Sequence, residues 1–137
     1  MAGINDPAEI ARALKTARTI AVVGCSPKDD RPSHVIASYL LRAGFDVIPV
    51  NPGHTEILGQ TCYPDLGSIP KDVRLDIVDV FRRSEFVPGI AEATLARGAG
   101  FFWMQDGVVD EEAARGLAAA GIPVAMDRCI FRDHAAL

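Results

Sequence analysis

The sequence predicts an α/β fold, a three-layer sandwich in which helices cover both faces of a mostly parallel sheet of five or six strands. Short apolar runs rich in β-branched residues, such as residues 19–23, are typical of strands buried on both faces. Segments with helical periodicity lie between these runs, and glycine, proline or a capping residue separates the two kinds of segment. Strands that alternate with helices in this way indicate a parallel sheet.

The first half of the predicted sheet is a βαβ unit. A helix is expected to begin at Pro7, where Asp6 has the character of an N-cap, and a strand follows at residues 19–23. The second helix begins at Pro32 and ends near Gly44, since glycine suits the left-handed position after a helix. The next strand is expected at residues 47–50 and runs parallel to the first.

A loop-rich segment follows, with a short edge strand expected at residues 62–63 and one helical turn at residues 64–69. The third clear strand is residues 75–81. Ser84 is then expected to cap a helix that ends at Gly98.

The last part of the chain repeats the alternation. Residues 99–104 form an apolar run that predicts a strand, residues 110–120 a helix, and residues 122–126 the final strand. Residues 127–134 close the chain with no element assigned to them.

Composition limits the classes of function. With 137 residues, 49% of them hydrophobic, the chain is expected to form one domain over residues 1–137. Its apolar runs are far shorter than the ~20 residues of a membrane helix. The N-terminus lacks the features of a signal peptide, so we expect a cytoplasmic protein that does not contact membranes. A net charge of −4 argues against a nucleic-acid partner.

The three cysteines, Cys25, Cys62 and Cys129, are widely spaced and odd in number, which argues against a disulfide framework. The chain has no Cys-x-x-Cys pair and no histidine pair at ligand spacing, so no metal site is expected.

The turn after the first strand has the chemistry of a phosphate site. Gly24 and Ser26 are followed by Lys28 and Arg31, and a helix begins just before Ser33. Backbone N–H groups and the helix dipole attract an anion there, and the cations add charge. Turns of this kind also occur without any ligand, so the local chemistry leaves both interpretations open.

Ligands of open parallel sheets bind outside the carboxyl ends of the strands. In this chain polar and cationic residues gather at those ends, whereas the strands themselves are apolar. The expected strand ends are residues 24–26, 51–52, 80–82, 104–105 and 127–129.

The residues argue against a nicotinamide or flavin dinucleotide. That fingerprint requires Gly-x-Gly-x-x-Gly, but no second glycine follows Gly24 within the turn. It also requires an acidic residue after the second strand, where this chain has Asn51 and Pro52. The turn suits a ligand that carries more phosphate charge.

Five segments together resemble the stand-alone CoA-binding proteins, a family similar to the N-terminal CoA-binding domain of the succinyl-CoA synthetase α subunit. The resemblance covers roughly residues 17–132. It implies a Rossmann-like fold with coenzyme A or an acyl-CoA across the strand ends. The segments are V-V-G-C-S-P-K-D-D-R-P-S, V-I-P-V-N-P, I-L-G-Q-T-C-Y-P-D-L, D-I-V-D-V-F-R-R-S-E and M-D-R-C.

The resemblance also implies the binding residues. The phosphate-binding turn falls on Gly24, Cys25, Ser26, Lys28, Arg31 and Ser33. The family's segment on the nucleotide side of the ligand corresponds to Val50, Asn51 and Pro52. The family's middle binding segment corresponds to Val80, Phe81, Arg82 and Arg83. The pantetheine side falls on Gln105, Asp127, Arg128 and Cys129. Cys25 departs from the small or apolar residue expected at its position, and no part of the chain corresponds to the ligase's phosphohistidine domain.

Several residues have more than one interpretation. Arg31 is interpreted as a phosphate ligand or as part of a solvated cluster with Asp29 and Asp30, and Asn51 as a ligand contact or a residue that orders its loop. Asp79, inside a strand, is expected to form an internal hydrogen bond.

Three functions remain open at this point. The residues supply phosphate binding but no general base, nucleophile pair or metal, which favours a non-catalytic module that binds CoA. Alternatively, Cys129 acts on an acyl-CoA or a CoA disulfide, with Arg128 beside it to stabilise the thiolate. A dinucleotide-binding redox sensor is the third possibility. The residues identify no protein partner.

Overall fold

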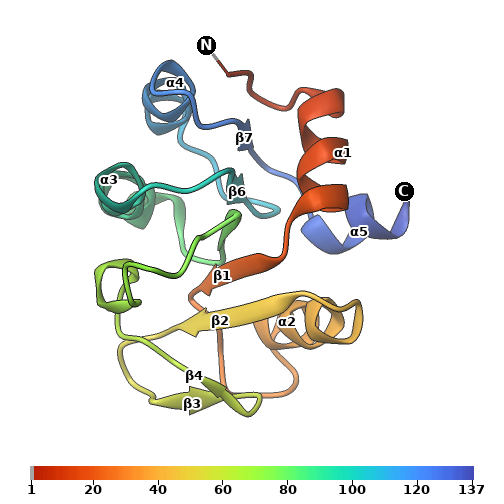
Figure 1. Ribbon diagram of the computed structural model, residues 1–137, viewed down its shortest axis with the longest axis vertical. Coiled ribbons are helices and arrows are strands. Elements are labelled where there is room, and N and C mark those ends of the chain that lie inside the picture. The colour runs from red at the N-terminus through yellow and green to blue at the C-terminus, as the bar shows by residue number, and fades with distance from the viewer. Residues whose placement is uncertain (1) are drawn as a thin grey trace.

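The computed structural model describes residues 2–137. Its centre is a five-stranded parallel sheet with the strand order β2-β1-β5-β6-β7 (Figure 1). This arrangement confirms the predicted α/β sandwich. The strands are β1 (Thr19–Val23), β2 (Asp46–Val50), β5 (Ile77–Val80), β6 (Phe102–Met104) and β7 (Val124–Ala125).

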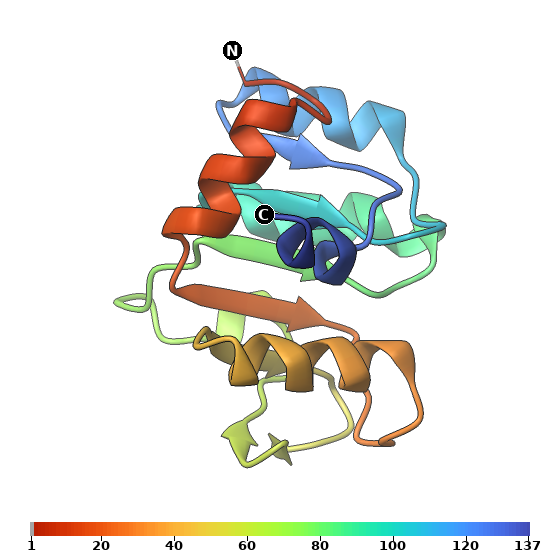
Figure 2. The same cartoon turned by 90° about the vertical axis from the view of Figure 1, so that its right-hand side faces the viewer.

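Helices cover both faces of the sheet (Figure 2). One face carries α1 (Pro7–Thr16), α2 (Pro32–Arg42) and α5 (Ile130–Ala135), and the other carries α3 (Val87–Arg97) and α4 (Glu111–Ala119). No helix within residues 2–137 has the length and apolar character needed to cross a bilayer.

Each face of the sheet has its own hydrophobic core. Alternate residues of a strand point to opposite faces, so Val22 and Trp103 pack under α2 and α5, while Val23 and Val80 pack under α3. Trp103 is fully buried, as expected for a residue of a central strand. The strands are mostly apolar because both of their faces are covered.

The order of the strands reverses between β1 and β5. From β1 the chain moves to one side to form β2, and then returns past β1 to form β5 on the other side. In register, Val23 at the end of β1 lies between Val50 and Val80. The loops that leave β1 and β5 therefore diverge from adjacent strands, which is where α/β sheets of this kind open a crevice for ligands.

Of the two predicted N-caps, Asp6 is confirmed and Ser84 is wrong, and Asp110, expected as the first helical residue, is the N-cap of α4. The carboxylate of Asp6 accepts a hydrogen bond from the Ala8 N–H at 2.9 Å, and that of Asp110 accepts one from the Ala113 N–H at 2.9 Å. Ser84 instead begins a 3₁₀ turn, η2 (Ser84–Phe86), and accepts a hydrogen bond from the Val109 N–H at 2.9 Å. Its hydroxyl ties α3 to the loop after β6 rather than capping the helix.

The loop-rich segment contains a small hairpin that the sequence did not predict. Strands β3 (Glu56–Ile57) and β4 (Gln60–Thr61) pair antiparallel, and the two residues between them, Leu58 and Gly59, both have positive φ angles. A leucine in that conformation is unusual, so the turn has no clear sequence signal. The expected edge strand at residues 62–63 is reduced to one bridge between Tyr63 and Val50, whereas the expected helical turn is present as η1 (Leu66–Ser68).

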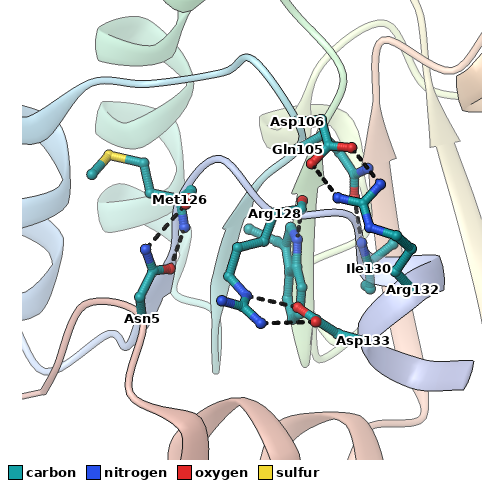
Figure 3. Close-up of polar contacts among 9 residues, drawn as sticks. Asn5, Gln105, Asp106, Met126, Arg128, Ile130, Arg132 and Asp133 are labelled. Atoms are coloured by element: carbon teal, nitrogen blue, oxygen red, sulfur yellow. Dashed lines mark hydrogen bonds and ion pairs between the residues drawn. The ribbon is translucent and has the colours of Figure 1, made fainter. Parts of the chain in front are cut away.

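The outer edge of β7 is covered by the segment that precedes α1. Ile4 forms a parallel bridge with Val124. The side-chain amide of Asn5 donates to the Met126 carbonyl at 3.1 Å and accepts from its N–H at 2.7 Å (Figure 3). This contact satisfies backbone groups that an open sheet edge exposes to other chains.

The loop between η1 and β5 is held by one arginine of α3. Nη1 of Arg97 donates to the carbonyl oxygens of Leu66 at 3.1 Å and Ile69 at 2.8 Å. Its Nη2 donates to those of Pro70 at 3.2 Å and Val73 at 2.7 Å. The planar guanidinium thus joins four carbonyl groups that have no strand partner.

We expect Arg97→Ala to lower the free energy of unfolding by about 2–3 kcal/mol, since charge-assisted hydrogen bonds to several carbonyl groups are lost together. Arg97→Lys should recover less than half of this loss, because a single ammonium group cannot reach the same set of acceptors. Urea denaturation measures both effects. Arg115→Ala, at an exposed position of α4, is the control and should change stability by less than about 0.5 kcal/mol. Equal losses for Arg97→Ala and Arg115→Ala would contradict this role.

Candidate functional site

A cavity of about 800 Å³ opens at the carboxyl ends of β1, β5 and β6, at the reversal of strand order. Its walls are the turn after β1, the first turn of α2, the residues that leave β5 and β6, and the residue before α5. Ten of the predicted binding residues line it: Gly24, Ser26, Lys28, Arg31, Ser33, Phe81, Arg82, Arg83, Gln105 and Cys129.

A second, smaller cavity of about 190 Å³ continues the first toward β2. The two share Gly24 and Arg82, which separate them. Val50 and Pro52 line the smaller cavity, so two further predicted residues belong to this groove. Its other walls are mostly apolar. Together the cavities cover the strand ends from β2 to β6.

The turn after β1 is held rigid by its own hydrogen bonds. The hydroxyl of Ser33 accepts from the Ser26 N–H at 2.9 Å, and the hydroxyl of Ser26 accepts from the Lys28 N–H at 3.1 Å. The amide of Asn51 donates to the Cys25 carbonyl at 2.9 Å. Ser33 and Asn51 thus fix the turn to α2 and to the end of β2, and Asn51 has the loop-ordering role.

Gly24 is the point of closest approach between the two diverging loops. Its φ is +84°, and a Cβ at this position would lie 2.5 Å from the Phe81 carbonyl oxygen and 2.8 Å from Cδ of Arg82. Both the left-handed backbone and the contact with a neighbouring main chain require glycine.

The rim of the cavity is cationic. Lys28 and Arg31 are exposed, and neither belongs to an ion pair within residues 2–137, so Arg31 forms no ion pair with Asp29 or Asp30. Arg31 occupies the N-cap position of α2, where the helix dipole also favours an anion.

Arg82 and Arg83 share one aromatic ring. The guanidinium of Arg82 lies 4.1 Å from the centre of the Phe86 ring, and that of Arg83 lies 5.5 Å from it. Arg83 also pairs with Glu85 at 3.1 Å, in an exposed position. The arrangement of these cations suits a polyanion. Within the described part of the chain, no group of three or more His, Cys, Asp or Glu residues is placed to hold a metal ion.

Five predicted residues do not line either cavity: Cys25, Asn51, Val80, Asp127 and Arg128. Cys25 and Val80 are buried in the two cores. Asp127 accepts a hydrogen bond from the Gly107 N–H at 2.7 Å, which joins the loops after β6 and β7. These residues support the walls of the site from behind.

Arg128 does not line the cavity, and its side chain points toward Asp133 of α5 (Figure 3). Its Nε and Nη2 donate to the two carboxylate oxygens of Asp133, both at 2.8 Å, and these hydrogen bonds raise the pKa of Arg128. Cys129 lies on the cavity wall and is 7% exposed. The expected stabilisation of a Cys129 thiolate by Arg128 is therefore not supported, since the guanidinium is engaged elsewhere.

The sequence did not identify five residues of the larger cavity: Pro32, Ile36, Asp106, Gly107 and Val108. Three of them follow Gln105 directly, so extending the expected strand end by three residues would have found them. Ile36 lies one helical turn after Ser33, on the side of α2 that faces the sheet. Residues three apart share a face of a helix, so the spacing from Ser33 was a sequence signal that Ile36 faces the site.

A buried carboxyl group lies close to the turn. Asp79 is fully buried between Val22 and Trp103 of the adjacent strands, and neither of its oxygens has a partner in residues 2–137. The expected internal hydrogen bond is therefore wrong. Burial raises the pKa of Asp79 well above its usual value. Burial first, and then the nearby Cys62 and Asp79, raise the pKa of the Cys25 thiol to about 12.

The chain matches the family model of the CoA binding domain over residues 18–135. It belongs to this CoA-binding family. A relative, the uncharacterized protein YneT of Bacillus subtilis (strain 168), is 46% identical over 128 residues, which are 93% of each protein. A hypothetical protein from Pyrococcus horikoshii OT3 has a solved structure that matches with a TM-score of 0.90 and 34% identity, covering 96% of this chain and 92% of that one.

The family domain also occurs inside larger proteins. Acetate–CoA ligase (ADP-forming) I of Archaeoglobus fulgidus is 38% identical over 63 residues, which are 46% of this chain and 9% of the ligase. The parallel sheet and the turn after β1 are thus those of a CoA-related binding module.

We expect Gly24→Ala to destabilise the protein more than Gly121→Ala does. Gly121 has a similar φ of +90°, but a Cβ there would meet nothing within 4 Å. The control substitution should therefore show the conformational cost alone, about 1–2 kcal/mol. The contact with Phe81 should add at least about 1 kcal/mol to the loss for Gly24→Ala. Equal losses in chemical denaturation would show that the close approach does not constrain position 24.

We expect Asp79→Asn to be more stable than the wild type at neutral pH. The folded state raises the pKa of Asp79. The contribution of Asp79 to the free energy of unfolding is therefore complete at a pH below its pKa in the unfolded chain, about 3.9. That contribution is lost as the pH rises toward the pKa of Asp79 in the folded protein. The stability difference between the proteins should therefore grow from pH 4 upward, by about 1.4 kcal/mol per pH unit. Denaturation curves at several pH values measure it, and a difference independent of pH would contradict the assignment.

Proposed function

We propose that the protein binds coenzyme A or an acyl-CoA at the carboxyl ends of the parallel strands, as a binding or regulatory module rather than as a catalyst. The observation that carries this proposal is the cavity at the strand-order reversal, whose rim holds Lys28, Arg31 and Arg82, none of which forms an ion pair within residues 2–137. Membership of the CoA-binding family supports the identity of the ligand.

The two cavities suggest how the ligand lies. The phosphates of CoA sit in the middle of the molecule, and the cations Lys28, Arg31 and Arg82 lie where the cavities meet or beside the start of α2. The adenosine then occupies the smaller cavity beside Val50 and Pro52. The uncharged pantetheine arm extends along the larger cavity toward Cys129.

The lining of the larger cavity supports recognition rather than chemistry. Its one carboxylate, that of Asp106, is held by Arg132 through two hydrogen bonds of 2.7 Å, and this contact lowers the pKa of Asp106. A carboxylate held in this way is a poor general base. The cavity wall includes no histidine among the described residues.

An enzyme that acts through Cys129 is the second candidate, because that thiol lies on the cavity wall. A Cys129→Ser variant that binds CoA normally but loses turnover of an acyl-CoA or a CoA disulfide would support it. The dinucleotide-binding redox sensor is disfavoured by the missing glycines of the turn. Ligase activity is not proposed, since the shared segment is a small part of the ligase.

We expect calorimetric titration to show CoA binding with a Kd on the order of micromolar, weaker binding of dephospho-CoA, and no binding of NAD. Arg31→Ala should weaken CoA binding about tenfold, because one charge-assisted contact to phosphate is lost. Lys15→Ala, in the last turn of α1, is a matched loss of one cation remote from the cavity and should leave the affinity unchanged. Absence of CoA binding at about 1 mM would refute the proposal.

A further inference from the structure

We propose that the inner end of the larger cavity recognises the carbonyl group of an acyl thioester, and that Gln105 is the residue that selects acyl-CoA over free CoA. This inference rests on the proposed function and names the form of the ligand. Gln105 is the first residue after β6 and lines the cavity, yet it is only 4% exposed.

One half of the Gln105 amide is fixed by the fold. Its Oε1 accepts a hydrogen bond from the Ile130 N–H at 3.1 Å, at the start of α5 (Figure 3). Because the oxygen is held there, the orientation of the Nε2 amino group is also set. Nε2 itself makes no hydrogen bond within residues 2–137. Within that range the buried side-chain atoms without a partner are those of Asp79, so Nε2 is still open to solvent, on the side where Gln105 lines the cavity. A ligand oxygen in the cavity would accept its hydrogen bond in place of water.

The surroundings of Gln105 favour an uncharged acceptor. Ile36 and Phe81, which carry no charge, line the same cavity together with Cys129. The nearby Asp106 carboxylate is already satisfied by Arg132. The exposed cations Lys28 and Arg31 come from the turn after β1 and the start of α2, so the charged part of the ligand has a separate place.

A thioester carbonyl meets these requirements and a free thiol does not. A carbonyl oxygen accepts hydrogen bonds well, whereas a thiol is a weak acceptor. A short acyl chain beyond the carbonyl would lie against apolar side chains. The two amide carbonyls of the pantetheine arm are also acceptors, but they lie nearer to the phosphates, whereas Gln105 contacts the residue after Cys129, on the side of the cavity assigned to the end of the arm.

The test compares acetyl-CoA with S-ethyl-CoA, a thioether that lacks only the carbonyl oxygen, and with free CoA. We expect the wild type to bind acetyl-CoA about tenfold more tightly than S-ethyl-CoA. Gln105→Glu keeps an oxygen for the Ile130 N–H and replaces the amino group by a second oxygen, so the donor is lost and a negative charge is added. The added charge acts on acetyl-CoA and S-ethyl-CoA alike and cancels in the ratio of their affinities. In this variant the preference for acetyl-CoA over S-ethyl-CoA should therefore disappear.

A second measurement needs no variant. The chain contains two glutamines, Gln60 and Gln105. In a ¹⁵N-labelled protein the side-chain amide signal of Gln105 should shift on addition of acetyl-CoA and not of S-ethyl-CoA. The signal of Gln60, in the β3–β4 hairpin, is the internal control and should not move.

The outcomes separate the two proposals. If none of the three ligands binds, the proposed function fails and this inference fails with it. If CoA binds but the wild type has equal affinity for acetyl-CoA and S-ethyl-CoA, the inference alone is refuted. An equal loss of affinity for all three ligands in Gln105→Glu also refutes it, since the preference for acetyl-CoA would then persist without the amino group of Gln105.

Discussion

The close approach of two main chains at Gly24 is the constraint on which the site depends. β1 and β5 are neighbours in the sheet, but the chain leaves them in opposite directions, and the backbone at Gly24 lies against the Phe81 carbonyl. A side chain at position 24 would push the loops apart. With glycine there, the first turn of α2 and the residues after β5 form two walls of one cavity, and Arg82 reaches across the strand ends.

In the turn after β1, one set of side chains fixes the backbone and a different set carries the positive charge. Ser26, Ser33 and Asn51 direct their hydrogen bonds into the turn itself and fix its shape. The side chains of Lys28 and Arg31 remain exposed beside the cavity. A protein with a net charge of −4 can therefore present a locally cationic surface, because charges beyond about 8–10 Å are screened at physiological salt. A preformed turn also lowers the entropy that binding would otherwise cost.

Below this cationic rim the ionisable groups are either buried or paired. Burial raises the pKa of Asp79 well above its usual value, and the Cys25 thiol is far from ionising at neutral pH. Asp106 and Arg128 are each paired with a residue of α5. Such surroundings suit an uncharged group bound through directed hydrogen bonds, and they provide little for proton transfer. The geometry is consistent in this respect with a module that binds its ligand without transforming it.

The sequence by itself determined the sandwich, the strands of the central sheet and the cap Asp6, because these depend on periodicity and on neighbours within one helical turn. It also identified the turn after β1, since strand ends and helix starts are local signals. The tertiary structure alone decided the partners of individual side chains. α5 is too short to be stable by itself and depends on Gln105 and Asp106, some 25 residues earlier. The contact of Asn5 with Met126 joins residues 121 positions apart, and no local pattern encodes a pairing at that distance.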